Sequence, residues 1–503
     1  MTSTIDRERD TSRRHPPAAE EGGGTRRWWV LAVVALAQLV VVLDATIVNI
    51  ALPTAQADLG FGNDARQWIV TAYALAFGSL LLLGGRLADL FGRKLLFLVG
   101  LTGFAVASAV GGAAEGFGML VTARAAQGVF GALLAPAALS LLTVTFAEGR
   151  DRGRAFAIFG AISGAGGAVG LILGGALTEY LSWRWCLYVN VPIAIAAIIG
   201  ALLVLPRHEP RVAGAPGLDV PGALLSIAGL VSLVYGLGSA ETEGWSSGTT
   251  LGFIGAGVVL LAAFVIVETR VAHPLLPMRV VTNRTRGGAF AAIALASAGI
   301  FGVFLFLTYF MSTVLGYEPL PTGLAFVPMI LSLMVAAQSS TSLVGRIGVK
   351  VPVTLGFLVA AAGMLLLVQL DVDSAYWTGV VPGLVVVGLG MGFVMAPAFS
   401  AATLGVRAED AGVASAAVNT FQQIGGSIAT AVLSALAASA AADALVGVDP
   451  SDPAAMVAAS VSSYTTVFAW SAVILAVGAV ISALLLPHGA IERDPDAAPV
   501  LAH

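Results

Sequence analysis

Two ionisable side chains, Asp44 and Arg124, lie well inside long apolar stretches of the sequence. A charge in apolar surroundings costs several kcal/mol unless it is paired or faces water, so both residues are expected to have a use. Asp44 lies about 24 Å along a helix from Trp28, in what the orientation given below makes the outer part of the first span. A carboxyl group there suits the binding and release of a proton, because burial favours its neutral form and a nearby cation favours its charged form.

Arg124 is expected to hold a fixed positive charge, because a guanidinium group does not deprotonate at accessible pH. Paired with an acid or with helix carbonyl groups, it would tune a proton site without carrying the proton. Each residue also has a simpler interpretation. Asp44 could reach the outer lipid headgroups, and Arg124 could be a structural tie between helices, as buried ion pairs often are.

Other kinds of site find little support in the sequence. The single cysteine, Cys186, excludes an intramolecular disulfide and a cysteine-based metal site, and the five histidines lie outside the spans without a partner at ligand spacing. The 29 acidic and 25 basic residues give a net charge of -4, and the bases are scattered singly, so nucleic acid is not an expected partner. The spans hold no cluster of catalytic groups, so we do not expect an enzyme.

Fourteen long apolar stretches must position these side chains. Since 58% of the residues are hydrophobic and 11% are charged, lipid is the expected solvent for most of the chain. A spanning helix needs about 20 mostly apolar residues, and in lipid the backbone must satisfy its own hydrogen bonds. We therefore predict an all-helical membrane protein with fourteen transmembrane helices, at residues 28–50, 67–84, 95–113, 118–142, 155–178, 185–205, 219–240, 249–269, 287–312, 321–342, 351–370, 375–400, 411–436 and 464–487.

The distribution of basic residues predicts the orientation of these helices. If the N-terminus is inside, every basic residue faces the cytoplasm except Arg66 and Arg184, which lie outside, and Arg124 within a span. Positive charge favours the cytoplasmic side, so residues 1–27, a polar stretch expected to be disordered, and residues 488–503 are predicted to be cytoplasmic tails. The membrane is expected to be the plasma membrane. Arginine far outnumbers lysine and alanine is abundant, which is typical of a bacterium with a GC-rich genome.

Sequence echoes relate the first six spans to the last six. They share an offset of about 260 residues and pair Gly92 with Gly348, Pro136 with Pro397, Gly153 with Gly412, and Gly166-Gly167 with Gly425-Gly426. The echoes predict two pseudo-symmetric six-helix halves, residues 28–205 and 286–487, and an inserted helix pair with flanking loops at residues 206–285. Two like halves with a site between them form the architecture of a secondary transporter.

Residues 85–94, between spans two and three, combine glycine with charge. The glycines allow a tight turn and close packing of helix ends, the aspartate can accept backbone N–H groups at a helix start, and the basic residues supply partners. A turn that carries a solvated charge cluster is the alternative. The candidate residues are Gly85, Arg86, Asp89, Gly92 and Arg93.

Span five is unusually rich in glycine, which makes a helix soft and lets its neighbours approach closely. A general packing face of small residues is the simpler interpretation. The glycines to which we assign a role are Gly166, Gly170, Gly174 and Gly175.

Several polar and aromatic residues are candidates for lining a central cavity. Asn419, Gln422 and Gln423 share one face of span thirteen at positions i, i+3 and i+4, where amides could bind a ligand or one another. Phe301 and Phe304 share a face of span nine with Thr308 and Met311. This face suits hydrophobic ligands that are cationic or planar, although lipid contact is equally compatible with it. The remaining candidates are Thr46, Asn49 and Gln127.

Four motifs resemble those of one transporter family. Residues 43–53 resemble the first-span signature of the fourteen-helix drug/proton antiporters, a branch of the major facilitator superfamily. Residues 85–94 look like the superfamily's signature loop. Leu120 with Arg124, Gln127 and Gly128 looks like its span-four motif, and residues 183–185 followed by 190–192 are similar to a segment typical of the branch. The glycines of span five resemble the antiporter motif, which normally has a proline where this chain has Leu171. Together the resemblance covers roughly residues 28–487.

The resemblance implies a secondary exporter of small amphipathic drugs or antibiotics, driven by protons that re-enter the cell through alternating access. It assigns proton coupling to Asp44, tuned by Arg124, and a conformational latch to Arg86, Asp89 and Arg93. No phosphate-binding loop of the GxxxxGK[ST] type is present, so ATP is not the expected driver, and no cofactor is implied. Function as a monomer is expected. Export of an endogenous metabolite, antibiotic or lipid is the alternative, and a metabolite importer on the same fold is less compatible with this cavity.

Overall fold

The structure is a computed structural model of the chain, and it describes residues 22–146, 150–206, 217, 219–406, 410–447, 449, 452–487 and 489. Within these residues the regular elements are helices, as predicted. Thirteen of the resulting segments are long and apolar enough to span a membrane. The remaining predicted span is α5, which runs for 31 residues and whose continuously described apolar part is Val169–Tyr180.

The N-terminal half contains six spans, the sixth of which is broken into two helices. The elements are α1 (Gly22–Leu59), α2 (Asn63–Phe91), α3 (Arg93–Gly112), α4 (Phe117–Thr145), α5 (Arg150–Tyr180), α6 (Trp185–Tyr188) and α7 (Asn190–Val204). The inserted pair follows as α8 (Val220–Glu243) and α9 (Gly248–Glu268).

The C-terminal half begins with the short helix α10 (Met278–Val281) and again contains six spans. A π-helical turn interrupts its first span, and another begins its fourth. The elements are α11 (Arg284–Gly302), η1 (Val303–Leu307), α12 (Thr308–Thr313), α13 (Pro319–Leu324), α14 (Val327–Ile347), α15 (Lys350–Leu367), η2 (Tyr376–Val380), α16 (Val381–Thr403), α17 (Ala411–Ala444) and α18 (Pro453–Leu485).

The internal repeats in the sequence, described above as echoes, correspond to repeated structural features. Gly92 separates α2 from α3 with a φ of 101°, and Gly348 separates α14 from α15 with a φ of 80°. This backbone conformation favours glycine because it has no Cβ. Pro136 lies inside α4 and Pro397 inside α16, while α5 packs along α1 as α17 packs along α11. The two halves are therefore related repeats, as predicted.

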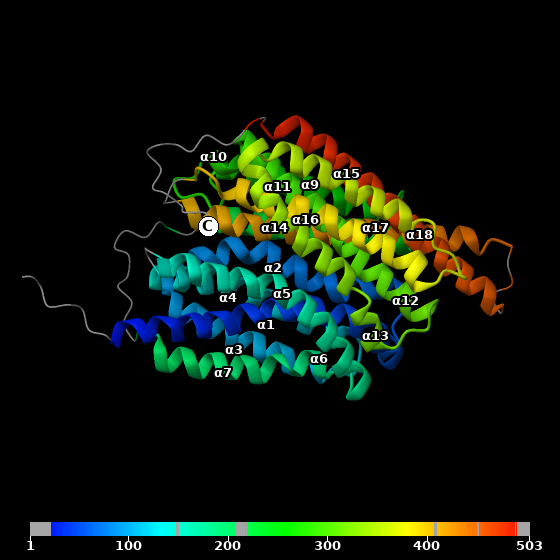
Figure 1. The fold of residues 1–503 in the computed structure, drawn as a ribbon, viewed down its shortest axis with the longest axis horizontal. Coiled ribbons are helices and arrows are strands. Elements are labelled where there is room, and N and C mark those ends of the chain that lie inside the picture. The colour runs from blue at the N-terminus through cyan, green and yellow to red at the C-terminus, as the bar shows by residue number, and fades with distance from the viewer. Residues whose placement is uncertain are drawn as a thin grey trace, which may run out of the picture.

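Figure 1 shows the two halves lying side by side, with the N-terminal helices grouped on one side and the C-terminal helices on the other. The start of α1 and the end of α18 lie at the same end of the bundle, here called the terminal end, while α13 lies at the opposite end, the α13 end. Helix α2 packs against α17, and α5 packs against α13. The inserted helix α8 contacts both α2 and α17, and therefore bridges the two halves.

Several predicted boundaries were wrong, three of them with consequences for the interpretation. Helix α1 continues through Pro53 to Leu59, so Asp44 lies near its middle and not in an outer segment. Helix α2 continues to Phe91, so Gly85 is a helical residue and only Gly92 forms the turn. The last span begins at Pro453 and not at residue 464, because Asp452 caps the helix by accepting the N–H of Ala454 at 2.9 Å and proline is well suited to a first helical turn.

Candidate functional site

The carboxylate of Asp44 lies at the centre of a buried polar cluster inside the N-terminal half. Arg124 Nη1 donates a hydrogen bond to Asp44 Oδ2 at 2.5 Å, and this contact is also an ion pair. Gln127 Nε2 and Asn190 Nδ2 donate to Asp44 Oδ1 at 2.9 and 2.8 Å. Helices α1, α4 and α7 thus meet at one carboxyl group, and three donors stabilise its charged form.

Further contacts hold Arg124 and Gln127 in place. Arg124 Nε donates to the Ile69 carbonyl of α2 at 3.2 Å, and its guanidinium carbon lies 4.4 Å from the centroid of the Tyr73 ring. Gln127 Oε1 accepts from Arg124 Nη1 at 2.8 Å, and Gln127 Nε2 also donates to Ser108 Oγ of α3 at 2.7 Å. The cluster therefore ties five helices of one half together.

All the polar members of the cluster are shielded from the surroundings. Asp44 and Asn190 are 0% exposed and Arg124 is 1% exposed. The loss of one partner from a buried ion pair costs about 3 to 5 kcal/mol, because the other charge is left uncompensated. Asn190 Oδ1 is a buried acceptor without a hydrogen-bond partner. The cluster is consequently sensitive to a change of charge on Asp44.

The local sequence explains how these side chains meet. Arg124 and Gln127 are three residues apart and project from one face of α4. Gly128 allows α2 to approach that face, since a Cβ at this position would lie 2.4 Å from the Tyr73 carbonyl oxygen. Asn190 begins α7 directly after the break that follows α6, which places its amide at the depth of Asp44.

The glycines of α5 provide a close contact with α1, the helix that carries Asp44. A Cβ at Gly170 would lie 2.0 Å from Thr46 Oγ1, and one at Gly174 would lie 2.8 Å from the Ile47 carbonyl oxygen. Gly166 lies one turn earlier against Val42. At Gly170 and Gly174 a Cβ would clash, so these two contacts require glycine. We call this line of contacts the α1–α5 seam.

Gly175, the fourth glycine assigned a role, faces the other half. A Cβ there would lie 2.5 Å from the Pro319 carbonyl oxygen of α13, and one at Gly323 would lie 2.4 Å from the Leu171 carbonyl oxygen. Leu171, which stands where the antiporter motif normally has proline, is fully buried within an uninterrupted helix. Close packing between α5 and α13 is therefore achieved without that proline.

Several contacts at the α13 end join the two halves. Tyr309 Oη donates to Gln56 Oε1 at 2.6 Å, and the guanidinium carbon of Arg66 lies 4.2 Å from the centroid of the Tyr309 ring. The Leu320 N–H donates to Glu179 Oε2 at 3.0 Å. We call these three contacts, together with the packing of Gly175 on α13, the α13-end seal.

Three of the cavity candidates lie in the N-terminal half and already have partners. Thr46 Oγ1 donates to the carbonyl groups of Val42 and Leu43, and Asn49 Nδ2 donates to those of Ala45 and Thr46. Gln127 belongs to the buried cluster and has no exposed surface. The structure thus groups Gln127 with Asp44 instead of placing it on an open surface.

The candidates in the C-terminal half lie on α11, η1 and α17. Asn419 is exposed, while Gln422 and Gln423 are half-buried on the same helix. The Phe301 ring lies over Gly426, and the Phe304 ring centroid lies 5.2 Å from that of Phe326. Both phenylalanines pack against neighbouring helices in this conformation, and a role in binding substrate stays a prediction.

Residues 85–94 lie at the terminal end of the bundle. Arg86 Nη2 donates to the Pro274 carbonyl at 2.9 Å, so this candidate latch residue contacts the segment after the inserted pair. Gly85 has ordinary packing space, because a Cβ there would meet its nearest neighbour, Pro136, at 3.7 Å. Arg93 starts α3. The side chain of Asp89 lies outside the described part of the structure.

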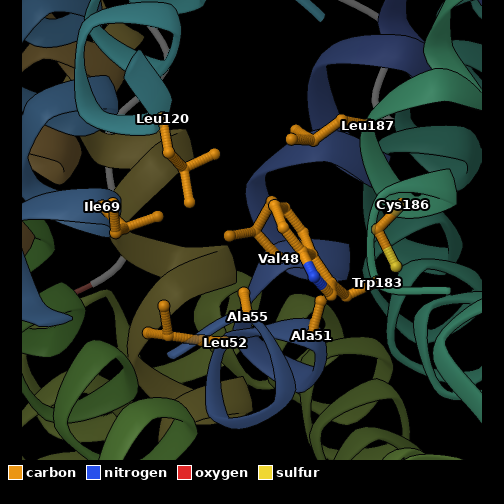
Figure 2. Close-up of a pocket in the computed structure, with 9 residues that line it drawn as sticks. All are labelled: Val48, Ala51, Leu52, Ala55, Ile69, Leu120, Trp183, Cys186 and Leu187. Carbon is orange, nitrogen blue, oxygen red and sulfur yellow. The ribbon is translucent and has the colours of Figure 1, made fainter. Parts of the chain in front are cut away.

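A small hollow lies next to the cluster, toward the α13 end (Figure 2). Ile69 and Leu120 lie on one wall, opposite Trp183 and Cys186, with Val48 of α1 between them. Its volume of about 10 Å³ is near the minimum that holds one water molecule, so it does not accommodate a drug. Near this hollow, Arg184 forms an ion pair with Asp58 at 2.5 Å, which joins the segment before α6 to the end of α1.

Two polar members of the cluster, Asn190 and Ser108, have no role predicted from the sequence. Asn190 belongs to a segment that resembles one typical of the antiporters, but nothing in the sequence identifies its partner. Ser108 is one of many serines in apolar stretches, and such residues usually bond to their own helix. Spacing within one helix does not reveal contacts between distant helices.

Comparisons with known proteins agree with this architecture. Residues 34–430 match the family profile described as Major Facilitator Superfamily. The chain is 48% identical over 459 residues to the puromycin resistance protein of Streptomyces alboniger, covering 91% of this chain and 90% of the relative. It is 41% identical over 405 residues to the cephamycin export protein of Amycolatopsis lactamdurans, covering 80% and 83%.

Solved structures support the fold. A bacterial homologue of the human lysosomal transporter Spinster, in an inward-facing and unoccupied conformation, superposes with a TM-score of 0.64 at 15% identity, covering 92% of this chain and 97% of that chain. The resemblance seen in the motifs is confirmed at the level of the family, whose members are membrane transporters and not enzymes. The profile match spans most of the sequence, and the chain belongs to the Major Facilitator Superfamily.

Proposed function

We propose that this protein exports small amphipathic compounds, antibiotics among them, from a bacterial cell in exchange for protons. The names of the relatives support antibiotic export, since one confers puromycin resistance and another exports cephamycin. The observation that carries proton coupling is the burial of Asp44 among Arg124, Gln127 and Asn190. A buried carboxyl group with this set of partners changes its contacts when it gains or loses a proton.

Protonation would weaken the cluster in a defined way. A neutral Asp44 no longer attracts the Arg124 guanidinium and accepts hydrogen bonds less strongly. The ties from α1 to α4 and α7 therefore loosen when a proton binds. Because Gly170 and Gly174 hold α5 directly against α1, a shift of α1 is transmitted to α5 along the α1–α5 seam.

The α13-end seal is the other element of the proposed cycle. It joins α1, α2 and α5 to α12 and α13, and it must open for a compound to leave at that end. We assign the α13 end to the cell exterior and the terminal end to the cytoplasm, with both termini inside. The basic residues support this assignment, since Arg26, Lys94 and Arg284 cap the terminal ends of α7 and α18 by donating to carbonyl groups.

The proposed exporter works as a single chain in the plasma membrane. Each half contributes one side of the α13-end seal, so one copy contains both moving parts. Proton and compound stabilise opposite-facing states, and each therefore favours release of the other.

Puromycin transport by the purified protein in proteoliposomes tests the proposal. An imposed proton gradient should drive uptake into inside-out oriented vesicles, and Asp44→Asn should abolish that uptake while puromycin binding persists. Asp443→Asn, which changes an exposed carboxylate of α17, is the matched control and should transport normally. Gradient-driven transport by Asp44→Asn would remove Asp44 from proton coupling, and puromycin binding without transport by the unaltered protein would contradict the export proposal.

A narrow substrate range is the second candidate. It is favoured by two of the relatives, whose names refer to single antibiotics, puromycin and cephamycin. Resistance of cells expressing the protein to a panel of chemically unrelated compounds distinguishes the two. Protection against one structural class indicates a dedicated antibiotic exporter, and protection against many classes indicates a multidrug exporter.

A further inference from the structure

Two acidic side chains come together at the terminal end of the inserted helix pair. Asp219 precedes α8 and caps it, since its Oδ1 accepts the Gly222 N–H at 2.9 Å. Glu268 is the last residue of α9, and its Oε2 accepts the Leu276 N–H at 3.0 Å. They are only 6% and 3% exposed, which is unusual for carboxyl groups.

The remaining oxygens of the two acids face the same point. Asp219 Oδ2 and Glu268 Oε1 are both buried, and each lacks a hydrogen-bond partner. A Cβ at Gly222 would lie 2.3 Å from the first atom and 2.8 Å from the second, so the two oxygens lie within a few ångströms of each other. A side chain at residue 222 would separate them.

Two ionised carboxylates are unstable in this arrangement. Both are acceptors only, so neither can donate to the other, and their charges repel strongly in a poorly solvated site. One proton resolves both problems, because the protonated carboxyl group donates to the other, as in other closely spaced acid pairs.

No neighbouring base contacts the two facing oxygens of Asp219 and Glu268 in the described part of the structure. The groups that act on Glu268 are Asp219 and the backbone N–H groups of Leu275 and Leu276, in addition to burial itself. The bases nearby in the fold include Arg86 of α2, which donates to Pro274, and Arg279, which forms a two-bond ion pair with Asp410 before α17. Arg270 and His273 occupy the segment after α9, and both are exposed.

Glu268 also contacts the segment after α9, which accepts a hydrogen bond from Arg86 of α2. Glu268 fixes the N–H of Leu276, and the carbonyl of Pro274, two residues earlier, accepts the hydrogen bond from Arg86. Leu275 and Leu276 are buried, which anchors the segment between these two contacts. Repulsion between two ionised acids would displace Glu268 and with it the acceptor of Arg86.

We propose that Asp219 and Glu268 form a second proton-binding site, independent of Asp44, in which one shared proton holds residues 269–277 against α2. The site binds its proton at low pH and loses it as the pH rises. The segment is therefore docked on Arg86 at low pH and released at high pH. This proposal concerns the inserted pair alone and does not depend on export or on Asp44.

Infrared difference spectra of the full-length protein in lipid nanodiscs test the shared proton. The Asp44→Asn background removes the buried acid of the N-terminal half from the spectrum. Asp410, the remaining buried acid among the described residues, forms a two-bond ion pair with Arg279 and is not part of the acid pair. Titration to high pH should then remove the absorption of a protonated carboxyl group. Glu268→Gln and Asp219→Asn should each abolish that change, whereas Glu243→Gln, which alters an exposed acid at the far end of α8, should leave it intact.

Hydrogen exchange of residues 269–277 tests the coupling in the same samples. After correction for the intrinsic pH dependence of exchange, protection of this segment should fall with rising pH in the parent protein. In Glu268→Gln it should stay high, because the amide donates to Asp219 at every pH. A carboxyl signal that survives in both pair variants, or protection whose pH dependence is the same in Glu268→Gln as in the parent, would overturn the proposal.

Discussion

The guanidinium group of Arg66 rests on the Tyr309 ring, 4.2 Å from its centroid, so that a cation of the N-terminal half is held by an aromatic residue of the C-terminal half. The Phe306 ring lies 5.5 Å from the same group. Arg66 is 8% exposed, and partial loss of water strengthens a contact between a cation and an aromatic ring. This contact stabilises the closed form of the α13-end seal.

Arg66→Gln should therefore shift the protein toward a conformation that is open at the α13 end. Loss of the cation removes about 0.5 to 2 kcal/mol, which corresponds to a change of about twofold to thirtyfold in the ratio of the two states. Spin-label distances between α1 and α12 at that end measure the shift. Arg346→Gln, at an exposed position of α14, should leave the distances unchanged, and unaltered distances in Arg66→Gln would show that the contact does not hold the seal closed.

The α1–α5 seam predicts opposite results for two neighbouring glycines. Gly170→Ala would place its Cβ 2.0 Å from Thr46 Oγ1 and should destabilise the protein by about 1 to 3 kcal/mol. Gly167→Ala should be tolerated, because its Cβ would meet Thr46 at an ordinary 3.8 Å. Thermal unfolding and transport are the measurements.

A second substitution tests whether the clash acts through Thr46. Thr46→Ala removes the hydroxyl group and should partly restore the stability of Gly170→Ala, although the Leu43 carbonyl oxygen would remain 3.1 Å from the new Cβ. Equal losses with and without Thr46→Ala would place the effect of Gly170 elsewhere.

Asn190→Leu should destabilise the buried cluster and slow transport. The Asn190 amide donates to Asp44 at 2.8 Å, so the substitution removes one of the three donors to this buried carboxylate. Hydrogen bonds to charged groups contribute about 1.5 to 3 kcal/mol, and the free energy of unfolding should fall by about that amount. Gln369→Leu changes an exposed amide and should leave stability and transport unchanged; normal stability and transport in Asn190→Leu would show that the cluster does not need this donor.

A reporter fused at residue 245, in the turn between α8 and α9, tests the topology. This turn follows the seventh span, so with both termini in the cytoplasm a reporter there should behave as external. A cytoplasmic result would contradict the proposed orientation of the inserted pair.

The sequence predicted the fold well because each span leaves a strong local signal. An apolar stretch of sufficient length identifies a helix, and Gly92 and Gly348 marked the repeat. The errors arose where helices extend beyond their apolar part. The predicted first span ends at residue 50, whereas α1 continues through Pro53 to Leu59, because helices in a membrane tolerate proline when neighbouring groups satisfy the backbone.

The candidate site was predictable only in part. Asp44 and Arg124 were identifiable because a buried charge is costly inside a span. Asp219 and Glu268 escaped notice because an acid at the end of a span normally reaches water at little cost, and the sequence does not show that two helix ends converge. Ser108 and Asn190 gain their meaning from Asp44, which is distant in the chain.

The inserted pair makes the two lines of contact between the halves unequal. Helix α8 lies along the line where α2 meets α17, while the other line of contact is made by α5 with α13 and α14. For an apolar compound that reached the exporter from the bilayer, α8 would stand in the way at the first line and not at the second. The two extra helices would then set the side from which such a compound enters.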